Sequence, residues 1–132
     1  MPLNIQNISK NLDDLDYKQM PHNIEAEQQL LGALLINNDL IDRISNFLKP
    51  EHFYESVHAV IYELIVKLVL SNKLASPITL KNLIDQDERF NDLEGGKYLV
   101  KLAAENTSII NIGEYARIIY HLYINKGKYE NV

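Results

Sequence analysis

The residues best suited to chemistry in this chain are its four histidines. His58 follows Glu55 by three positions, and this Glu-x-x-His spacing is used for di-metal sites in helical bundles. Such a site needs a second copy of the motif and two further carboxylates, and the sequence contains no second copy. His22, His52, His58 and His121 also lack helical metal-ligand spacing among themselves. We therefore interpret His58 as a hydrogen-bonded residue at the start of a helix.

Gly95-Gly96-Lys97 is the one candidate for a phosphate-binding loop. A Walker A loop requires a glycine five positions before the Gly-Lys pair and a serine or threonine after it. Asn91 and Tyr98 occupy those two positions, so the pattern fails at both. We interpret the glycines as a flexible helix start. No catalytic, cofactor-binding or metal-binding residue is predicted, and no cofactor is expected.

Composition and charge favour a single domain that binds proteins. The chain has 132 residues, no cysteine, and 13 basic against 18 acidic residues, which give a net charge of −5. Because DNA-binding proteins usually carry basic clusters and this chain has none, we expect no direct DNA binding. No apolar run reaches the roughly 18–20 residues of a membrane span, so we expect no membrane contact. The absence of cysteine, and so of disulfides, fits a cytoplasmic location, which we expect.

The periodicity of apolar residues predicts an all-α fold, a compact orthogonal bundle of about six short helices, because no segment alternates with period two. The expected helices cover residues 24–36, 39–48, 57–70, 79–84, 97–105 and 112–126. Asn23 is expected to cap the first, with Glu25 and Glu27 interacting with its dipole. The core-facing stripe of that helix is expected to be Ile24, Gln28, Leu31 and Leu35, with Leu34 at its edge.

Helix 57–70 is apolar on almost all sides, so it should be buried centrally or covered by another chain; we expect it at the centre of the core, capped by Ser56 and with Tyr62 on its far side. Phe53 and Tyr54, in a single turn after Pro50, are expected to fill the core. Residues 86–93 are expected to form a loop with Phe90 turned inward, and Gly127 is expected to end the last helix.

Helix 112–126 offers more apolar surface than one intramolecular face can use. This excess predicts a partner surface. The candidate partner-interface residues are Tyr115, Ile118, Ile119, Tyr120, Leu122 and Tyr123.

Five motifs over residues 21–123 carry a family resemblance. They are Ile24-Glu25-Ala26-Glu27-Gln28 with Leu31-Gly32, Phe53-Tyr54 with His58 and Ile61, Pro77-Ile78 with Thr79-Leu80, Gly95-Gly96 with Tyr98-Leu99 and Leu102, and Asn106-Thr107 with Asn111, Tyr115-Ala116 and Ile118. In this order they resemble the N-terminal domain of DnaB-type replicative DNA helicases. Two departures stand out: Thr79 follows Ile78 directly, and Lys126-Gly127-Lys128 stands where the family continues helical with an arginine.

The resemblance implies an all-helical interaction domain that self-associates through a helical hairpin, forms a collar on a hexameric ring, and receives primase and the helicase loader. It divides the chain into a flexible N-terminal tail (1–20), a globular helical domain (21–110) and the start of a truncated hairpin (111–132). The ATPase motor, with its ATP and magnesium, would lie elsewhere, so this chain is not expected to be an enzyme.

Two other hypotheses stay open at this point. The chain could be a stand-alone helical adaptor from a truncated helicase gene. It could also be a small metal-dependent enzyme built around His52, His58 and nearby acids.

Overall fold

The computed structural model describes residues 22–106 and 111–130, without the side chains of residues 127–130. The all-α prediction is confirmed, and these residues contain no strand. The elements are α2 (Ile24–Ile36), η1 (Asn38–Arg43), η2 (Pro50–His52), α3 (Ser56–Leu70), α4 (Pro77–Ile84), η3 (Glu88–Leu93), α5 (Gly96–Ala104) and α6 (Ile112–Glu130), where η denotes a 3-10 helix. The predicted tail, residues 1–20, lies outside the described residues.

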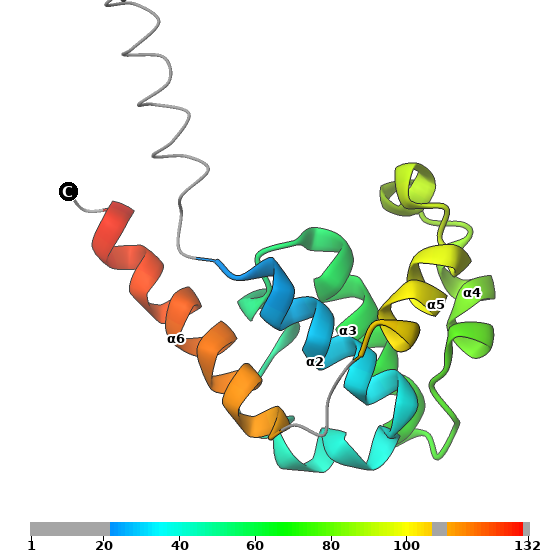
Figure 1. Ribbon diagram of the computed structural model, residues 1–132, viewed down its shortest axis with the longest axis horizontal. Helices are drawn as coiled ribbons and strands as arrows, with labels where there is room; N and C mark the ends of the chain where they lie inside the picture. The colour runs from blue at the N-terminus through cyan, green and yellow to red at the C-terminus, as the bar shows by residue number, and fades with distance from the viewer. Residues whose placement is uncertain (1–21, 107–110, 131–132) are drawn as a thin grey trace, which may run out of the picture.

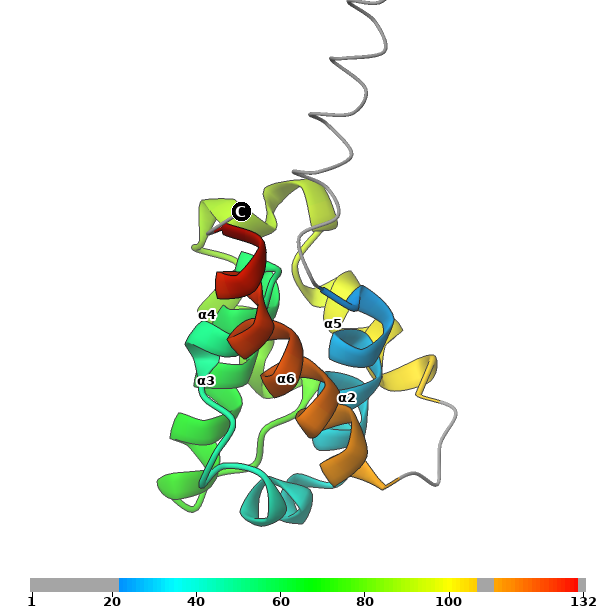
Figure 2. The same cartoon turned by 90° about the vertical axis from the view of Figure 1, so that its left-hand side faces the viewer.

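The central helix is α2. It packs against α3, α5, α6 and η1, with α5 and α6 on different sides of it (Figures 1 and 2). Leu30, Leu31 and Leu34 of α2 are fully buried, whereas Leu70 at the end of α3 is 78% exposed. The prediction that α3 is the centre of the core is therefore wrong. Some of the apolar residues of α3 are left partly or largely exposed rather than covered by the core.

The start of α2 is as predicted, but its buried face is rotated. The Asn23 side chain accepts a hydrogen bond from the Ala26 N–H at 2.9 Å, which confirms the cap. Ile24 and Gln28, expected in the core-facing stripe, are only partly buried. The buried residues of α2 are instead Ala26, Glu27, Leu30, Leu31, Gly32, Leu34 and Leu35.

A close approach of backbones fixes α5 against α2. A Cβ added at Gly32 would lie 2.2 Å from the carbonyl oxygen of Leu102, so only glycine fits there. Gln29 Nε2 also donates to the Glu105 carbonyl at 3.2 Å. The interpretation of Gly95-Gly96 as a helix start is confirmed, because Gly95 has a φ of +36° and α5 begins at the next residue.

The segment predicted as helix 39–48 is a 3-10 helix followed by turns. The Asn38 side chain bonds to a carbonyl at the end of α2 that a backbone N–H would bind if the helix continued. Its Nδ2 donates to the carbonyls of Leu34 at 2.7 Å and Ala75 at 2.8 Å. Its Oδ1 accepts from the Ala75 N–H at 2.8 Å. One side chain thereby joins the end of α2 to the segment before α4.

Around α3, three predictions need correction. Ser56 is the first residue of the helix rather than its cap, and the cap position, Glu55, makes no capping bond with its own side chain. Tyr54 is 41% exposed rather than buried, although Phe53 is in the core. Tyr62 is buried, and its hydroxyl donates to the Leu48 carbonyl at 2.8 Å.

Two short elements differ slightly from expectation. α4 begins two residues earlier than predicted, because Pro77 suits the first helical turn and Ser76 and Thr79 cap each other reciprocally. The expected loop 86–93 contains η3, and Phe90 is buried as predicted.

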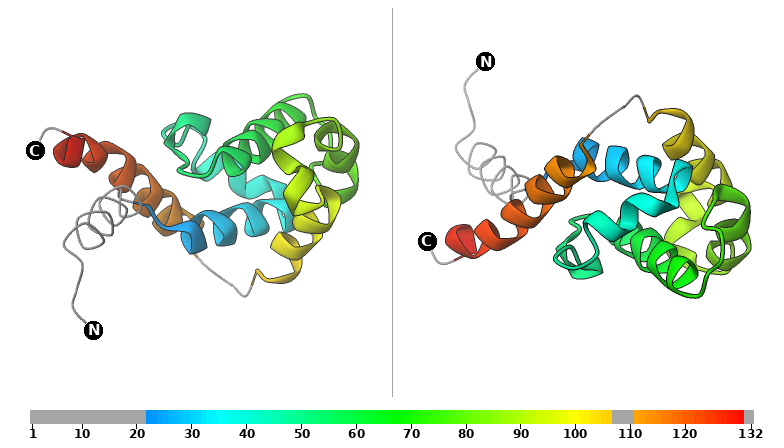
Figure 3. Two further views of the ribbon diagram at one scale, coloured as in Figure 1. Left: turned by 90° about the horizontal axis from the view of Figure 1, so that it is seen from above. Right: turned by 90° about the horizontal axis from the view of Figure 1, so that it is seen from below.

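Helix α6 crosses α2, and its C-terminal part extends beyond the rest of the bundle (Figures 1 and 3). Its first half belongs to the common core through Ile112, Ala116 and Ile119. Gly127 lies within α6 and does not end it, so that prediction is wrong. Within the part of the chain that the structure describes, no helix is long and apolar enough to span a membrane.

Candidate functional site

A chain of hydrogen bonds joins three helices through Glu27, His58 and Tyr98. Glu27 of α2 and His58 of α3 are both almost completely buried, and their Oε1 and Nδ1 atoms lie 2.8 Å apart. His58 Nε2 lies 2.5 Å from the hydroxyl of Tyr98 on α5. Gln28 Nε2 donates to the same hydroxyl at 3.3 Å. The interpretation of His58 as a hydrogen-bonded residue near a helix start is confirmed.

One placement of the protons satisfies every group in this series of hydrogen bonds. A carboxylate only accepts, so His58 Nδ1 carries a proton and donates to Glu27. In a neutral imidazole the other nitrogen accepts, and the Tyr98 hydroxyl supplies that proton while its oxygen accepts from Gln28. All four groups are then satisfied by one arrangement.

The order acid–histidine–hydroxyl invites comparison with a catalytic triad. Burial raises the pKa of Tyr98, the nearby carboxylates of Glu55, Glu27 and Glu105 raise it further, and the Gln28 hydrogen bond only partly opposes this. A nucleophile needs the opposite, a lowered pKa or an exposed hydroxyl beside a base. These hydrogen bonds therefore suit a structural role, in which they join α2, α3 and α5.

Glu27 also caps α3 from a distance. Its Oε2 accepts from the Tyr54 N–H at 2.7 Å, and its Oε1 lies 3.3 Å from the Glu55 N–H, which also donates to it. These donors precede the first turn of α3, where the helix dipole favours a negative charge. The sequence interpretation of Glu27 as a first-turn residue of its own helix missed this role. Its position three, four and seven residues before Leu30, Leu31 and Leu34 was the available signal.

The six predicted interface residues divide between the core and the surface of α6. Ile119 is 2% exposed and lies in the core of this chain, so it has almost no surface left for a partner. Tyr115 and Tyr120 pack partly against the core. Ile118 is 37% exposed, and Leu122 and Tyr123 are partly buried. Ile124, which was not predicted, is 49% exposed.

A cluster of rings holds α6 against η2. The His52 ring packs edge-on against Tyr120, with centroids 5.1 Å apart, and at a tilt against Tyr123 at 4.7 Å. Tyr120 also meets Phe47 edge-on at 5.9 Å. Burial lowers the pKa of His52, an effect that Glu51 opposes and Lys49 reinforces. His52 Nδ1 accepts from the Lys49 N–H at 2.9 Å, a bond that needs the neutral ring.

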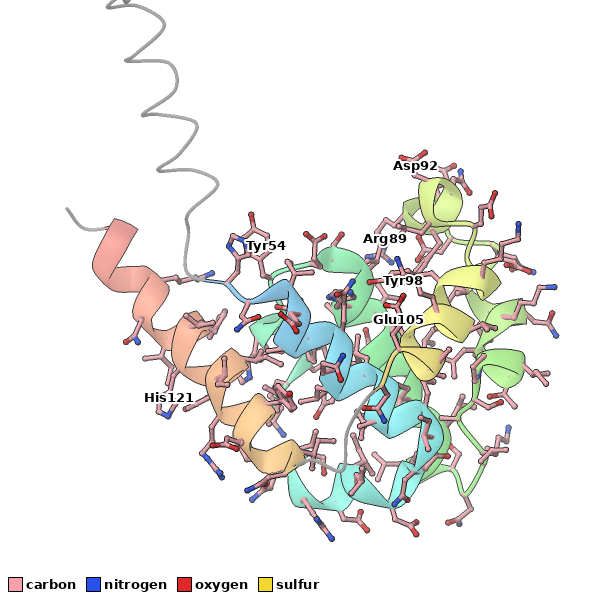
Figure 4. All side chains as sticks on the ribbon, viewed as in Figure 1. Tyr54, Arg89, Asp92, Tyr98, Glu105 and His121 are labelled. Atoms are coloured by element: carbon pink, nitrogen blue, oxygen red, sulfur yellow. The ribbon has the colours of Figure 1, made fainter. Side chains whose placement is uncertain are left out.

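Two adjoining hollows flank α6 where α2 begins. The first, which we call the anchor pocket, has a volume of about 130 Å³ and lies between α6 and the segment 51–54; its lining includes His52, Phe53, Tyr54, Leu122 and Tyr123. The second, the outer hollow, is lined by Glu114, Arg117, Ile118 and His121. His22, Asn23 and Leu122 border both. In Figure 4, Tyr54 lies beside the start of α2, and His121 points away from the bundle.

The two histidines of the metal-enzyme hypothesis are engaged within the fold. Both ring nitrogens of His58 have protein partners, and one nitrogen of His52 has. Across residues 22–106 and 111–130, no group of three or more metal-ligating side chains converges. Buried side-chain nitrogens and oxygens in that part of the chain all have hydrogen-bond partners.

Sequence comparisons with known proteins identify the family of this chain. The profile of the family described as DnaB-like helicase N terminal domain matches residues 19–121. The replicative DNA helicase DnaB of Rickettsia typhi is 43% identical over 125 residues, covering 94% of this chain and 25% of that protein. The replicative DNA helicase DnaB of Pasteurella multocida is 34% identical over 99 residues, covering 75% of this chain and 21% of that protein.

A solved structure has the same fold. The crystal structure of the N-terminal domain of DnaB helicase from Mycobacterium tuberculosis aligns with a TM-score of 0.75 and 27% identity, covering 84% of this chain and 80% of that one. This chain spans about a quarter of the length of the helicases it matches. On the profile match and the identity to these relatives, the chain belongs to the DnaB-like helicase N-terminal domain family.

Proposed function

We propose that this chain is the protein-interaction and oligomerisation part of a replicative DNA helicase, and that the outer face of α6 is its main contact surface. The observation that carries the proposal is the exposure of Ile118 beside the half-buried Leu122, which lies four residues further along the same face of α6. Contiguous exposed apolar residues on a folded domain are typical of protein interfaces. The relatives named above are replicative DNA helicases, which supports the proposal that the partners act in DNA replication.

The partners of this face are a neighbouring helicase subunit first, and primase and the helicase loader next. The anchor pocket supports this assignment, because a small pocket that combines Phe53 and Leu122 with tyrosine and histidine rings suits an anchor residue of a partner. The net charge of −5 argues against DNA as the partner. The chain itself is proposed to bind no ATP and no metal, and to act by packing rather than by catalysis.

Sedimentation velocity over a range of protein concentrations tests this proposal. Ile118→Asp and Leu122→Asp together should weaken self-association by on the order of tenfold or more, because charges at an interface centre must be desolvated. Val100→Asp is the matched control, since Val100 is 57% exposed on α5, at the other end of the bundle. The proposal fails if the wild-type chain stays monomeric and also does not bind a primase C-terminal domain in a titration.

A further inference from the structure

The two hollows on α6 share lining residues and form one continuous surface that combines apolar and charged groups. Leu122 lies between them, and Ile118 extends the apolar part into the outer hollow. Arg117 and His121 are exposed on the outer hollow, and Lys126 borders the anchor pocket. Three acids also line the two hollows: Glu51, Glu114 and the buried Glu27, whose oxygens are engaged by the Tyr54 and Glu55 N–H groups and by His58.

Such a surface suits a segment that carries apolar residues at helical spacing next to acids. The chain contains one. Ile8, Leu12 and Leu15 follow the spacing i, i+4, i+7, and Asp13, Asp14 and Asp16 cluster among them. These residues lie outside the described part of the chain, so the inference uses only their types and their order.

The attachment point makes this segment the nearest candidate. It joins the described structure at His22, which borders both hollows. Six residues lie between Leu15 and His22, and the seven Cα–Cα steps that join them span at most about 25 Å. A segment tethered this closely has an effective concentration on the order of millimolar at the surface, well above that of most free partners.

We propose that residues 8–16 of this chain bind the α6 face of the same molecule, with the apolar side chains of Leu12 and Leu15 over Ile118, Leu122 and the anchor pocket, and the acids Asp13, Asp14 and Asp16 facing Arg117, His121 and Lys126. The segment thereby covers the surface that the proposed function gives to a neighbouring subunit. Association with that subunit must displace it. The inference shares a surface with the proposed function, but binding within one molecule does not depend on self-association.

Disulfide trapping in the full chain tests this binding, and the absence of cysteine from the sequence makes the trap unambiguous. We expect Leu15→Cys with Ile118→Cys to oxidise within one molecule on the order of tenfold faster than Leu15→Cys with Val100→Cys, the control at the far end of the bundle. Non-reducing electrophoresis and mass spectrometry at low protein concentration separate bonds within a molecule from bonds between molecules. Circular dichroism checks that every variant folds.

Charge reversal then tests the assigned contacts. The triple variant Asp13→Lys, Asp14→Lys, Asp16→Lys should slow trapping several-fold at low salt, and adding Arg117→Glu with Lys126→Glu should restore much of it. Equal trapping rates in the Ile118 and Val100 pairs overturn the inference. So does a bond formed only between molecules, which would place a second copy on this face. Trapping within a molecule that persists in a chain unable to self-associate supports the inference while the proposed function fails.

Discussion

The two sides of α2 are built differently. Toward α3 and α5, backbones meet at Gly32, and Glu27, His58, Tyr98 and Gln28 share a single hydrogen-bond chain. On the other side, only the first half of α6 enters the core. Rings of histidine and tyrosine fill the contact between α6 and η2, beside two hollows. The first side is close-packed and polar-satisfied. The second has open space and exposed apolar residues.

This difference indicates a division of labour. A surface that must accept partners needs a rigid support, because a binding face that moves must first be ordered. The α3/α5 side provides that support, since buried polar groups with all partners in place have one favoured arrangement. Substitutions on the α3/α5 side should therefore affect stability, and those on the α6 face should affect association.

The largest loss of stability is expected for Glu27→Ala. Removing this carboxylate leaves the Tyr54 and Glu55 N–H groups and His58 Nδ1 without their acceptor, all close to a helix start. We expect a loss of about 3–5 kcal/mol in the free energy of unfolding, measured by urea denaturation. Glu25→Ala, which changes an exposed acid in the same turn, should cost at most about 1 kcal/mol. Equal losses in the two variants would contradict the remote cap.

Two glycine substitutions should have opposite signs. Gly32→Ala forces the α5 backbone away from α2, with an expected cost of about 1–3 kcal/mol. At Gly113 in α6, an added Cβ would meet only the ends of the Asn111 and Arg117 side chains, at 3.2 and 3.3 Å. Gly113→Ala should therefore be neutral or stabilise by about 0.5 kcal/mol through helix propensity. Thermal unfolding of both variants measures the contrast, and a tolerated Gly32→Ala would argue against close packing between α2 and α5.

Much of the fold could be predicted because its signals are local. Asn23 as a cap and Gly95-Gly96 at the start of α5 each mark a helix boundary within a few residues. The partners of Glu27 could not be predicted in the same way, since Tyr54 and His58 are 27 and 31 residues away in sequence. The central position of α2 was missed for a related reason. Apolar content placed α3 in the centre, but burial depends on which helices a face meets.

The hydroxyl of Tyr98 should contribute more than that of a tyrosine on α6. Tyr98→Phe deprives His58 Nε2 of a donor and Gln28 of an acceptor, so we expect a loss of about 1–2 kcal/mol in the free energy of unfolding. Tyr115→Phe keeps the ring packing of α6 and should change it by about 0.5 kcal/mol or less. Chemical denaturation of both variants measures the difference, and a larger effect at Tyr115 would reverse the assignment of the rigid side.

The smallest effect concerns pH and the α6 side. The pKa of His52 is lowered in the folded chain, so below the ordinary value of 6.5 the unfolded chain binds more protons at this residue. The contribution of His52 to stability is present above that value and is lost as the pH falls toward the folded pKa. We expect the urea concentration at the unfolding midpoint to decrease as the pH is lowered from about 7.5 to about 5.5. The decrease should be smaller in His52→Gln. The control variant, His121→Gln, should keep the pH dependence of the wild-type chain. If His52→Gln also keeps it, His52 does not cause the pH dependence of stability.

The Asn38 side chain has a further consequence for how the molecule opens. Its two bonds to Ala75 close a ring of chain that contains η1, η2 and all of α3. In local unfolding, this closure ties the segment before α4 to the end of α2, so a connecting segment that would otherwise fray early opens together with the core. The Ala75 amide should then exchange its hydrogen for deuterium as slowly as amides in the middle of α2. A residue in the connection between two helices would thus report the opening of the centre of the bundle.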